Sequence, residues 1–278
     1  MLPTIPSKIK TSLKFSGIDN IDKCRDKKHF EQYPYKVEYN YNSKGFRDTD
    51  WPDDLKSAIW CVGDSYTVGI GSPREHTWPA ILEKKINKRT INISLDGASN
   101  NWISRTAVKI LQEVQPAFLV IQWSFVNRRE ASVDEIQNIF FNNFYNKFKD
   151  PSWPNIELDE FYSLPDYIKQ ELKGHEHNWM NIADDNRLIH FLPDATNQDD
   201  FDNLVQCIDA VVNTFSKTKI IHGFVPQFAH NETYVHRKLT VKNKLPILEI
   251  KDYARDGYHY DKQTATVFVN EVIKYIDK

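Results

Sequence analysis

Two short motifs contain residues that together could perform nucleophilic chemistry. The first, GDSYTVGIG, places Ser65 directly after Gly63 and Asp64, and the second, ARDGYHYD, places Asp256 three positions before His259. A serine hydroxyl is a poor nucleophile until an imidazole takes its proton, and that imidazole needs a carboxylate to fix its tautomer. The three side chains are therefore a candidate Ser-His-Asp triad for acyl-group chemistry.

Each motif also has a purely structural interpretation. Asp-Ser after a glycine is a common turn or helix cap, and a solvated loop histidine beside a capping aspartate is equally ordinary. The catalytic interpretation is favoured because both motifs lie just beyond predicted strands. Ser65 follows a strand predicted at 58–62, and residues 256–259 lie between the last predicted strand and the last predicted helix. Ligands of parallel sheets bind at the carboxyl ends of the strands, where both motifs would meet.

The elements that would position these residues alternate along the chain from residue 57 onward. Short apolar runs predict strands, and apolar residues at helical spacing predict helices. The predicted strands cover residues 58–62, 90–95, 117–123, 219–225 and 246–250, and the predicted helices cover 77–86, 103–114, 204–215 and 265–276. A capping box formed by Ser132 and Glu135 predicts one more helix through Phe144. Strands separated by helices of this length predict a parallel sheet with helices on both faces.

Three regions of the chain are expected. Residues 1–56 form an irregular extension that packs on the domain, and within it residues 37–48 begin as a short extended segment and then turn at 42–45. Residues 57–278 form the α/β domain, with an insertion of little regular structure at about 149–200. The aromatic residues of this insertion could form a sugar-binding platform or their own small core: Trp153, Phe161, Tyr162, Tyr167 and Trp179.

The order of these motifs resembles that of the SGNH (GDSL-type) hydrolase family. The resemblance rests on GDSYTVGIG, on the glycine of LDGASNN after the second strand and on DGYH near the carboxyl end, and it covers about residues 57–278. The segment YNSKGFRD also looks like a lead-in that precedes the first motif in some members. The resemblance implies a three-layer α/β/α sandwich with a flavodoxin-like, mostly parallel sheet, and hydrolysis of esters without a metal.

Carried over by position, the resemblance implies a role for four residues. Ser65 would be the nucleophile and, through its N–H, the first donor of the oxyanion hole. Gly97 would supply the second backbone N–H, His259 would be the base and Asp256 would orient it.

The third oxyanion donor departs from the family pattern. Members carry Gly-x-Asn-Asp after the third strand, whereas this chain reads IQWSFVNRRE at 121–130. Ser124 stands in the place of the glycine, but the asparagine comes one position late, as Asn127. Asn127 could reach the hole after a local shift of the loop, Asn100 or Ser124 could replace it, or the donor could be absent. Residues 128–130 are expected to form a salt-bridged loop, and Asp64 to orient the serine loop through backbone hydrogen bonds.

Composition and charge exclude several classes of function. The formal net charge is −2, which gives no reason to expect a nucleic-acid or membrane partner. Three widely spaced cysteines exclude a disulfide framework, and His175 and His177 lack the partners of a zinc motif, so no metal and no cofactor are expected. The amino terminus has no signal-peptide core. A cytoplasmic location is the default expectation, although a virion component would look the same, and the oligomeric state is left open.

The expected function is therefore that of a serine esterase or deacylase. Its substrate would be a small-molecule or carbohydrate ester, with an O-acetyl group on a carbohydrate as one candidate. Two alternatives stay open: an acyltransferase that uses the same triad, and a binding or structural module that keeps the fold without turnover. The sequence does not separate hydrolysis from transfer, because the difference lies in which acceptor occupies the site.

Overall fold

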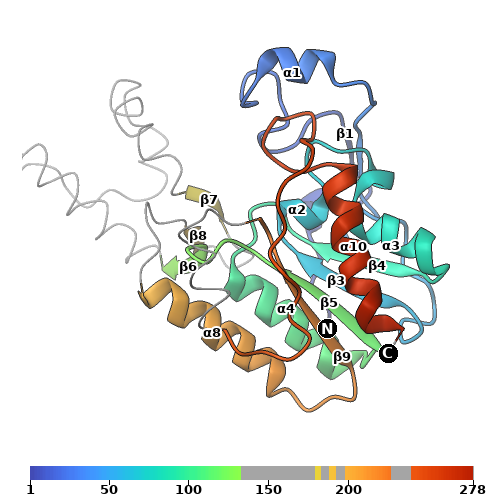
Figure 1. Cartoon of the computed structure of the whole chain (residues 1–278), viewed down its shortest axis with the longest axis vertical. Helices are drawn as coiled ribbons and strands as arrows, with labels where there is room; N and C mark the ends of the chain where they lie inside the picture. Colours follow the sequence, from blue (N-terminus) through green and yellow to red (C-terminus); the bar gives the residue numbers. More distant parts are fainter. Residues whose placement is uncertain (133–178, 183–187, 192–197, 227–238, 278) are drawn as a thin grey trace, which may run out of the picture.

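The computed structural model describes residues 1–132, 179–182, 188–191, 198–226 and 239–277 (Figure 1). At its centre is a sheet in the order β4-β3-β5-β9, formed by β3 (Ile59–Gly63), β4 (Thr90–Ser94), β5 (Phe118–Trp123) and β9 (Lys219–Phe224). All of its strand pairs are parallel. Four of the predicted strands are thereby confirmed, in the order second, first, third, fourth that flavodoxin-like sheets share.

The central strand β3 explains why the sheet is covered on both sides. Every residue of β3 is buried, as expected for a parallel strand with helices on both faces. Because side chains alternate along a strand, Trp60 and Val62 enter one hydrophobic core, whereas Ile59 and Cys61 enter the other.

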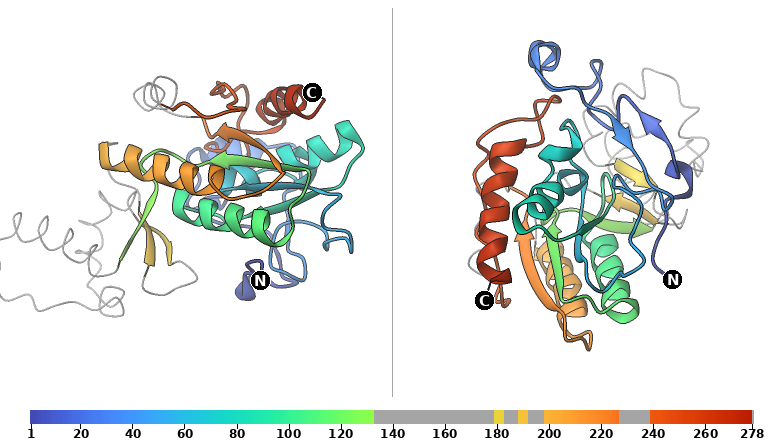
Figure 2. Two further views of the ribbon diagram at one scale, coloured as in Figure 1. Left: turned by 90° about the horizontal axis from the view of Figure 1, so that it is seen from below. Right: turned by 90° about the vertical axis from the view of Figure 1, so that its right-hand side faces the viewer.

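Two pairs of helices complete a three-layer sandwich (Figure 2). The helices α4 (Asn100–Glu113) and α8 (Gln198–Val212) supply the core that contains Trp60, and α3 (Trp78–Ile86) and α10 (Lys262–Ile276) supply the opposite core. The predicted helices at 77–86, 103–114, 204–215 and 265–276 are confirmed, and so is the predicted α/β/α architecture.

The fifth predicted strand, at 246–250, is wrong. The chain starts to pair beside β9, where His222 N–H donates to Asn243 O and Leu245 N–H donates to His222 O. The next residue is Pro246, which has no N–H to continue a ladder. Residues 246–250 therefore have no regular structure, although Leu248 and Ile250 pack against the core of α3 and α10. The apolar run predicted burial correctly but not hydrogen bonding.

A second, antiparallel sheet lies beside the main one. It has the order β6-β8-β7 and consists of β6 (Arg129–Ser132), β7 (Trp179–Ile182) and β8 (Leu188–Phe191). Two of these strands fall in the part of the insertion expected to have little regular structure. The helix predicted from Ser132 through Phe144 and most of the insertion's aromatic residues lie outside the described residues.

The amino-terminal segment contains short elements and packs against both the sheet and the loops above it. It includes a 3-10 turn η1 (Pro6–Lys8), β1 (Ser12–Leu13), α1 (Lys27–Gln32) and β2 (Tyr39–Asn40). Ile5 and Phe46 are buried in the same core as Trp60, and Val37 and Tyr39 pack against Val68. The short extended stretch predicted within 37–48 is confirmed as β2, which pairs antiparallel with β1.

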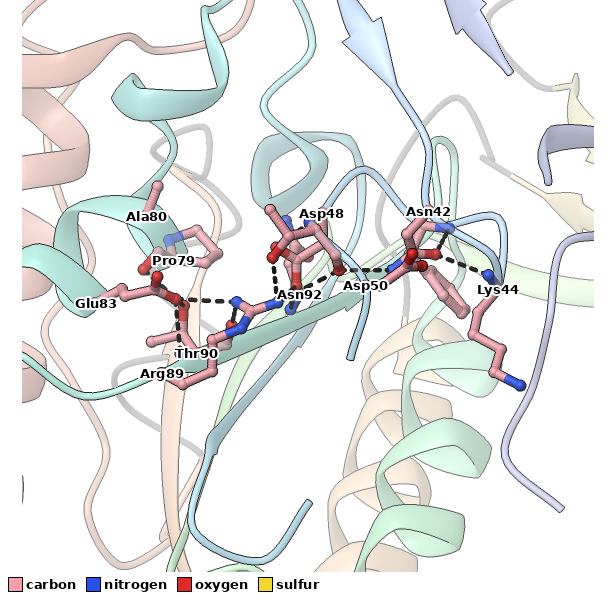
Figure 3. Close-up of polar contacts among 12 residues, drawn as sticks. Asn42, Lys44, Asp48, Asp50, Pro79, Ala80, Glu83, Arg89, Thr90 and Asn92 are labelled. Atoms are coloured by element: carbon pink, nitrogen blue, oxygen red, sulfur yellow. Dashed lines mark hydrogen bonds and ion pairs between the residues drawn. The ribbon is translucent and has the colours of Figure 1, made fainter. Parts of the chain in front are cut away.

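The YNSKGFRD motif folds as a turn tied to the sheet. Asn42 Oδ1 accepts hydrogen bonds from the backbone N–H groups of Lys44 (2.9 Å) and Phe46 (3.1 Å), which closes the predicted turn. The buried carboxylate of Asp48 lies between Arg89 Nη2 (2.9 Å) and the backbone N–H of Asn92 in β4 (3.0 Å) (Figure 3). The motif therefore anchors the amino-terminal segment to the edge strand β4.

No helix in the described part of the chain is both long and apolar enough to cross a bilayer.

Candidate active site

Ser65 lies at the carboxyl end of β3, where the strand turns directly into the one-turn helix α2 (Ser65–Val68). Asp64 caps this helix, because its Oδ1 accepts a hydrogen bond from the backbone N–H of Tyr66 at 3.0 Å. The turn is tight enough that a Cβ at Gly63 would collide with Thr67 Oγ1. The serine is almost fully buried, with 2% of its surface exposed.

Asp256 and His259 share one turn of the loop that precedes α10. Gly257 has a φ of +68°, a backbone conformation that residues with a side chain rarely adopt. Asp256 Oδ1 accepts hydrogen bonds from the backbone N–H groups of Tyr258 (2.9 Å) and His259 (3.0 Å). These bonds hold the carboxylate against the imidazole that follows it.

The structure brings Ser65, His259 and Asp256 together although the serine is 194 residues from the histidine. His259 Nε2 lies 2.8 Å from Ser65 Oγ, and His259 Nδ1 lies 2.5 Å from Asp256 Oδ2. An imidazole whose Nδ1–H donates to the carboxylate leaves Nε2 as the acceptor for the serine proton. This chain of contacts is the geometry that a serine nucleophile requires.

Asp256 and His259 each shift the pKa of the other, in the direction that a general base requires. Burial alone would lower the pKa of His259, but the charge of Asp256 and its hydrogen bond raise that pKa above its ordinary value. Burial would raise the pKa of Asp256, but His259 and the two backbone N–H groups lower it. Asp256 thus stays ionised and stabilises the imidazolium that proton transfer would produce.

Aromatic rings surround the imidazole. The centroid of the Tyr66 ring lies 4.6 Å from that of His259, and the Tyr258 centroid lies 5.3 Å away. Neither tyrosine was singled out from the sequence, although each is next to a motif residue in GDSY and GYHY. Their rings exclude water from the sides of the base and strengthen the electrostatic contacts there.

Two backbone N–H groups near Ser65 are not hydrogen-bonded to any described residue. They belong to Ser65 itself and to Gly97, and no group in the described ranges accepts from either of them. Leu95 N–H donates to Gly63 O at 3.2 Å, which joins the residue just after β4 to the last residue of β3. Ser65 lies two residues after Gly63, and Gly97 lies two residues after Leu95. Buried backbone donors are rarely left unsatisfied, so these two are suited to receive a ligand oxygen.

Two of the three candidates for a third donor have no hydrogen to offer. Asn100 Nδ2 donates to the backbone oxygens of Phe125 (2.9 Å) and Arg128 (3.2 Å), which uses both amide hydrogens. Ser124 Oγ donates to Asp64 Oδ2 at 2.6 Å. Asn127, the asparagine that comes one position late in the family pattern, is half-buried in the loop that Asn100 holds.

The residues expected to form ion pairs do so. Arg128 Nη1 lies 3.2 Å from Asp64 Oδ2, and both side chains are buried. Burial raises the pKa of Asp64, whereas Arg128 and the Ser124 hydroxyl oppose this rise. Asp64 Oδ1 accepts from the backbone N–H of Tyr66, which agrees with the expectation that Asp64 orients the serine loop. The next two residues also pair but lie in β6 rather than in a loop: Arg129 with Asp200, and Glu130 with Arg105.

Within the described ranges, no group of three or more His, Cys, Asp and Glu side chains is arranged to hold a metal ion. His175 and His177 lie outside those ranges.

The chain was compared with known families, sequences and structures. No family model matches it, and no curated protein matches its sequence. Among solved structures, it is similar to an acetyl xylan esterase from the rumen bacterium Butyrivibrio proteoclasticus, with 12% identity and a TM-score of 0.43 over 82% of this chain and 65% of that one. A GDSL-like lipase from Bacteroides thetaiotaomicron VPI-5482 has 12% identity and a TM-score of 0.36 over 82% of this chain and 91% of that one.

An SGNH-hydrolase family esterase has 15% identity and a TM-score of 0.26, over 79% of this chain and 96% of that one.

Proposed function

We propose that the protein is a serine-dependent esterase or deacylase that acts on a small-molecule or carbohydrate ester. The observation that carries the proposal is the unbroken chain of contacts from Ser65 Oγ to His259 Nε2 (2.8 Å) and from His259 Nδ1 to Asp256 Oδ2 (2.5 Å). A buried carboxylate, a base of raised pKa and a hydroxyl in this order are what nucleophilic acyl chemistry needs.

The reaction proceeds in two steps. Ser65 Oγ attacks the ester carbonyl carbon while its proton passes to His259 Nε2, and the carbonyl oxygen becomes an oxyanion. The N–H groups of Ser65 and Gly97 donate to that oxyanion. When the tetrahedral intermediate collapses, the C–O bond to the alcohol breaks and the alcohol leaves with the proton from His259. Water, activated by the same imidazole, then releases the acid and restores Ser65.

A fluorophosphonate probe tests the nucleophile directly. The folded wild type is expected to form an adduct on Ser65, because the probe reacts with an activated serine and not with an ordinary hydroxyl. The variant Ser65→Ala should form no adduct and should not hydrolyse 4-nitrophenyl acetate, with a melting temperature close to that of the wild type. Ser7→Ala, at an exposed serine, is the matched control and should keep both.

The outcome separates this proposal from its alternatives. A folded wild type that is neither labelled nor active would contradict it and favour a module without turnover. Hydrolysis that disappears in both Ser65→Ala and His259→Ala would exclude such a module. Acyl transfer uses the same covalent intermediate, so product analysis with and without a carbohydrate acceptor distinguishes transfer from hydrolysis.

A further inference from the structure

The two halves of the triad are joined by a buried network that begins in the amino-terminal segment. We propose that Tyr39, Asp19 and Arg255 are positioning residues, which hold the serine segment (residues 64–72) and the Asp256–His259 turn at the distance that proton transfer requires. This inference rests on the proposed function, because it concerns the same triad.

The first half of the network connects Tyr39 to the serine segment. The backbone N–H of Gly71 donates to Tyr39 Oη at 2.8 Å, and the tyrosine is fully buried. The guanidinium of Arg47 lies 4.3 Å from the centre of the Tyr39 ring. Arg47 Nη2 also donates to the backbone oxygen of Ser72 at 2.8 Å, and its Nη1 donates to that of Val68 at 3.2 Å. Arg47 Nη1 donates to the backbone oxygen of Gly69 as well, so the stretch that follows the nucleophile is held from the amino-terminal side at four backbone positions.

The second half connects Tyr39 to the residue that precedes Asp256. Tyr39 Oη donates to Asp19 Oδ2 at 2.5 Å. Arg255 donates to the same carboxylate twice, from Nη2 to Oδ2 at 2.6 Å and from Nε to Oδ1 at 2.9 Å. Asp19 is fully buried, so a two-pronged ion pair there is both strong and fixed in direction. The guanidinium of Arg255 also lies 4.6 Å from the centre of the Phe30 ring.

The two loops touch at the point where the network joins them. The backbone N–H of Arg255 donates to the backbone oxygen of Gly71 at 2.9 Å, while the backbone N–H of Gly71 donates to Tyr39 Oη. A second contact holds Asp256 from outside, because Arg25 N–H donates to the backbone oxygen of Asp256 at 3.0 Å. Gly71 and Arg255 are thus fixed relative to each other by a direct hydrogen bond and by the path through Tyr39 and Asp19.

None of the three side chains is a member of the triad, so each acts through its effect on geometry. The Tyr39 hydroxyl accepts from one loop and donates to the carboxylate that holds the other. Removing it breaks both connections without changing the packing of the ring. A small displacement of reacting groups lowers the rate of a step far more than it lowers affinity for substrate.

The variant Tyr39→Phe provides the test, and Tyr41→Phe is its matched control. Tyr41 lies on the same segment, and within the described residues its buried hydroxyl has no hydrogen-bond partner. With 4-nitrophenyl acetate as substrate, Tyr39→Phe is expected to lower kcat by about 10- to 100-fold, with KM changed by less than about twofold. The rate of fluorophosphonate labelling should fall in the same proportion. Tyr41→Phe should leave all three values unchanged.

A purely structural role would give a different result. It would lower the melting temperature while leaving kcat per folded molecule at the wild-type value, and that outcome would overturn the inference. If Tyr39→Phe does not fold, Arg255→Lys and Arg255→Met supply the same comparison. Lysine keeps the charge beside Asp19, so the inference requires partial rescue of kcat by lysine over methionine, and equal kcat values for the two would overturn it. Inactivity of the wild type contradicts the proposed function itself, whereas an active wild type with an unaffected Tyr39→Phe contradicts only the network.

Discussion

At His259 two opposing effects meet, since burial disfavours the imidazolium whereas the charge of Asp256 favours it. The second effect prevails, and the pKa of His259 is raised. A base in this state accepts a proton from Ser65 readily and is neutral only at pH values above its raised pKa. Activity of the wild type is therefore expected to increase with pH as His259 loses its proton.

The variant Asp256→Asn separates the two effects on His259. It removes the charge but keeps the size of the side chain, so burial is opposed only by the charges of Asp96 and Asp64, and the pKa of His259 should fall below that of the wild type. The variant should also lose about 10⁴-fold in kcat, because the amide does not hold the tautomer that the base requires. Titration of the His259 imidazole by NMR in both proteins measures the shift. An unchanged pKa would show that Asp256 does not control the base.

Asn127 and Asn100, the two asparagines near the proposed oxyanion site, should affect different properties, namely the rate of the reaction and the stability of the fold. If Asn127 supplies the third donor, Asn127→Ala lowers kcat by about 10² to 10³-fold with little loss of stability. Asn100→Ala instead leaves the Ser124 N–H without its partner and removes one of the two donors to the backbone oxygens of Phe125 and Arg128, and should destabilise the fold by about 1–3 kcal/mol. Steady-state kinetics and urea unfolding of the two variants make the comparison. Full activity of Asn127→Ala would leave the two backbone N–H groups as the proposed oxyanion donors.

At the scale of elements, the contact between β5 and β9 contains a buried histidine. His222 of β9 accepts a hydrogen bond at Nδ1 from the indole Nε1–H of Trp123 in β5, at 3.1 Å. Its backbone also pairs with the chain on its other side, next to Asn243 and Leu245. Burial lowers the pKa of His222 to about 4, so the imidazole is neutral in the folded protein at neutral pH.

This histidine makes the stability of the sheet depend on pH. Between pH 6.5, the ordinary pKa of the side chain, and about pH 4, the unfolded chain binds a proton that the folded chain does not. The contribution of His222 to stability is thus complete above pH 6.5 and falls by about 3 kcal/mol as the pH is lowered to about 4. His222→Gln keeps an acceptor without titrating, so its free energy of unfolding should fall less over this range. Urea unfolding of both proteins at several pH values tests this. An equal dependence of the free energy of unfolding on pH in the two proteins would contradict it.

At the scale of the whole molecule, the amino-terminal segment packs closely against the α/β sandwich. Phe46 and Ile5 are buried in the core of α4 and α8, Asp48 is bound to β4, and the network through Tyr39 reaches the Asp256–His259 turn. These contacts extend from one edge of the sheet to the loops at its carboxyl ends. We therefore expect residues 1–56 to unfold together with residues 57–278.

A pair of phenylalanine substitutions tests this expectation. Phe46→Ala removes a fully buried ring from the shared core and should cost about 3–5 kcal/mol in the free energy of unfolding, within a single cooperative transition. Phe215→Ala removes a ring that is 91% exposed and should change stability by less than about 0.5 kcal/mol. Calorimetry gives both values. A separate early transition affected only by Phe46→Ala would show that the segment folds apart from the domain.

Much of the architecture follows from local patterns in the sequence. The apolar runs at 58–62, 90–95, 117–123 and 219–225 form parallel strands, and residues at helical spacing between them form the covering helices. Such patterns predict strands and helices correctly because a parallel strand is buried on both faces and a covering helix on one. The spacing of apolar residues along the chain therefore reflects which side chains are buried. The failed strand at 246–250 has the same burial but contains Pro246, and the ladder ends before it.

The sequence by itself determined which residues could do the chemistry. The GDS motif contains the serine, the DxxH motif contains the aspartate and the histidine, and each motif follows a predicted strand. Only the tertiary structure decided which of these side chains contact one another and which already use their hydrogen-bonding groups elsewhere. It placed His259 Nε2 against Ser65 Oγ, used the amide of Asn100 to hold a loop, and joined Asp19 to Arg255 across 236 residues. Hydrogen bonds of this kind depend on direction and distance between segments remote in the chain, and no local periodicity records them.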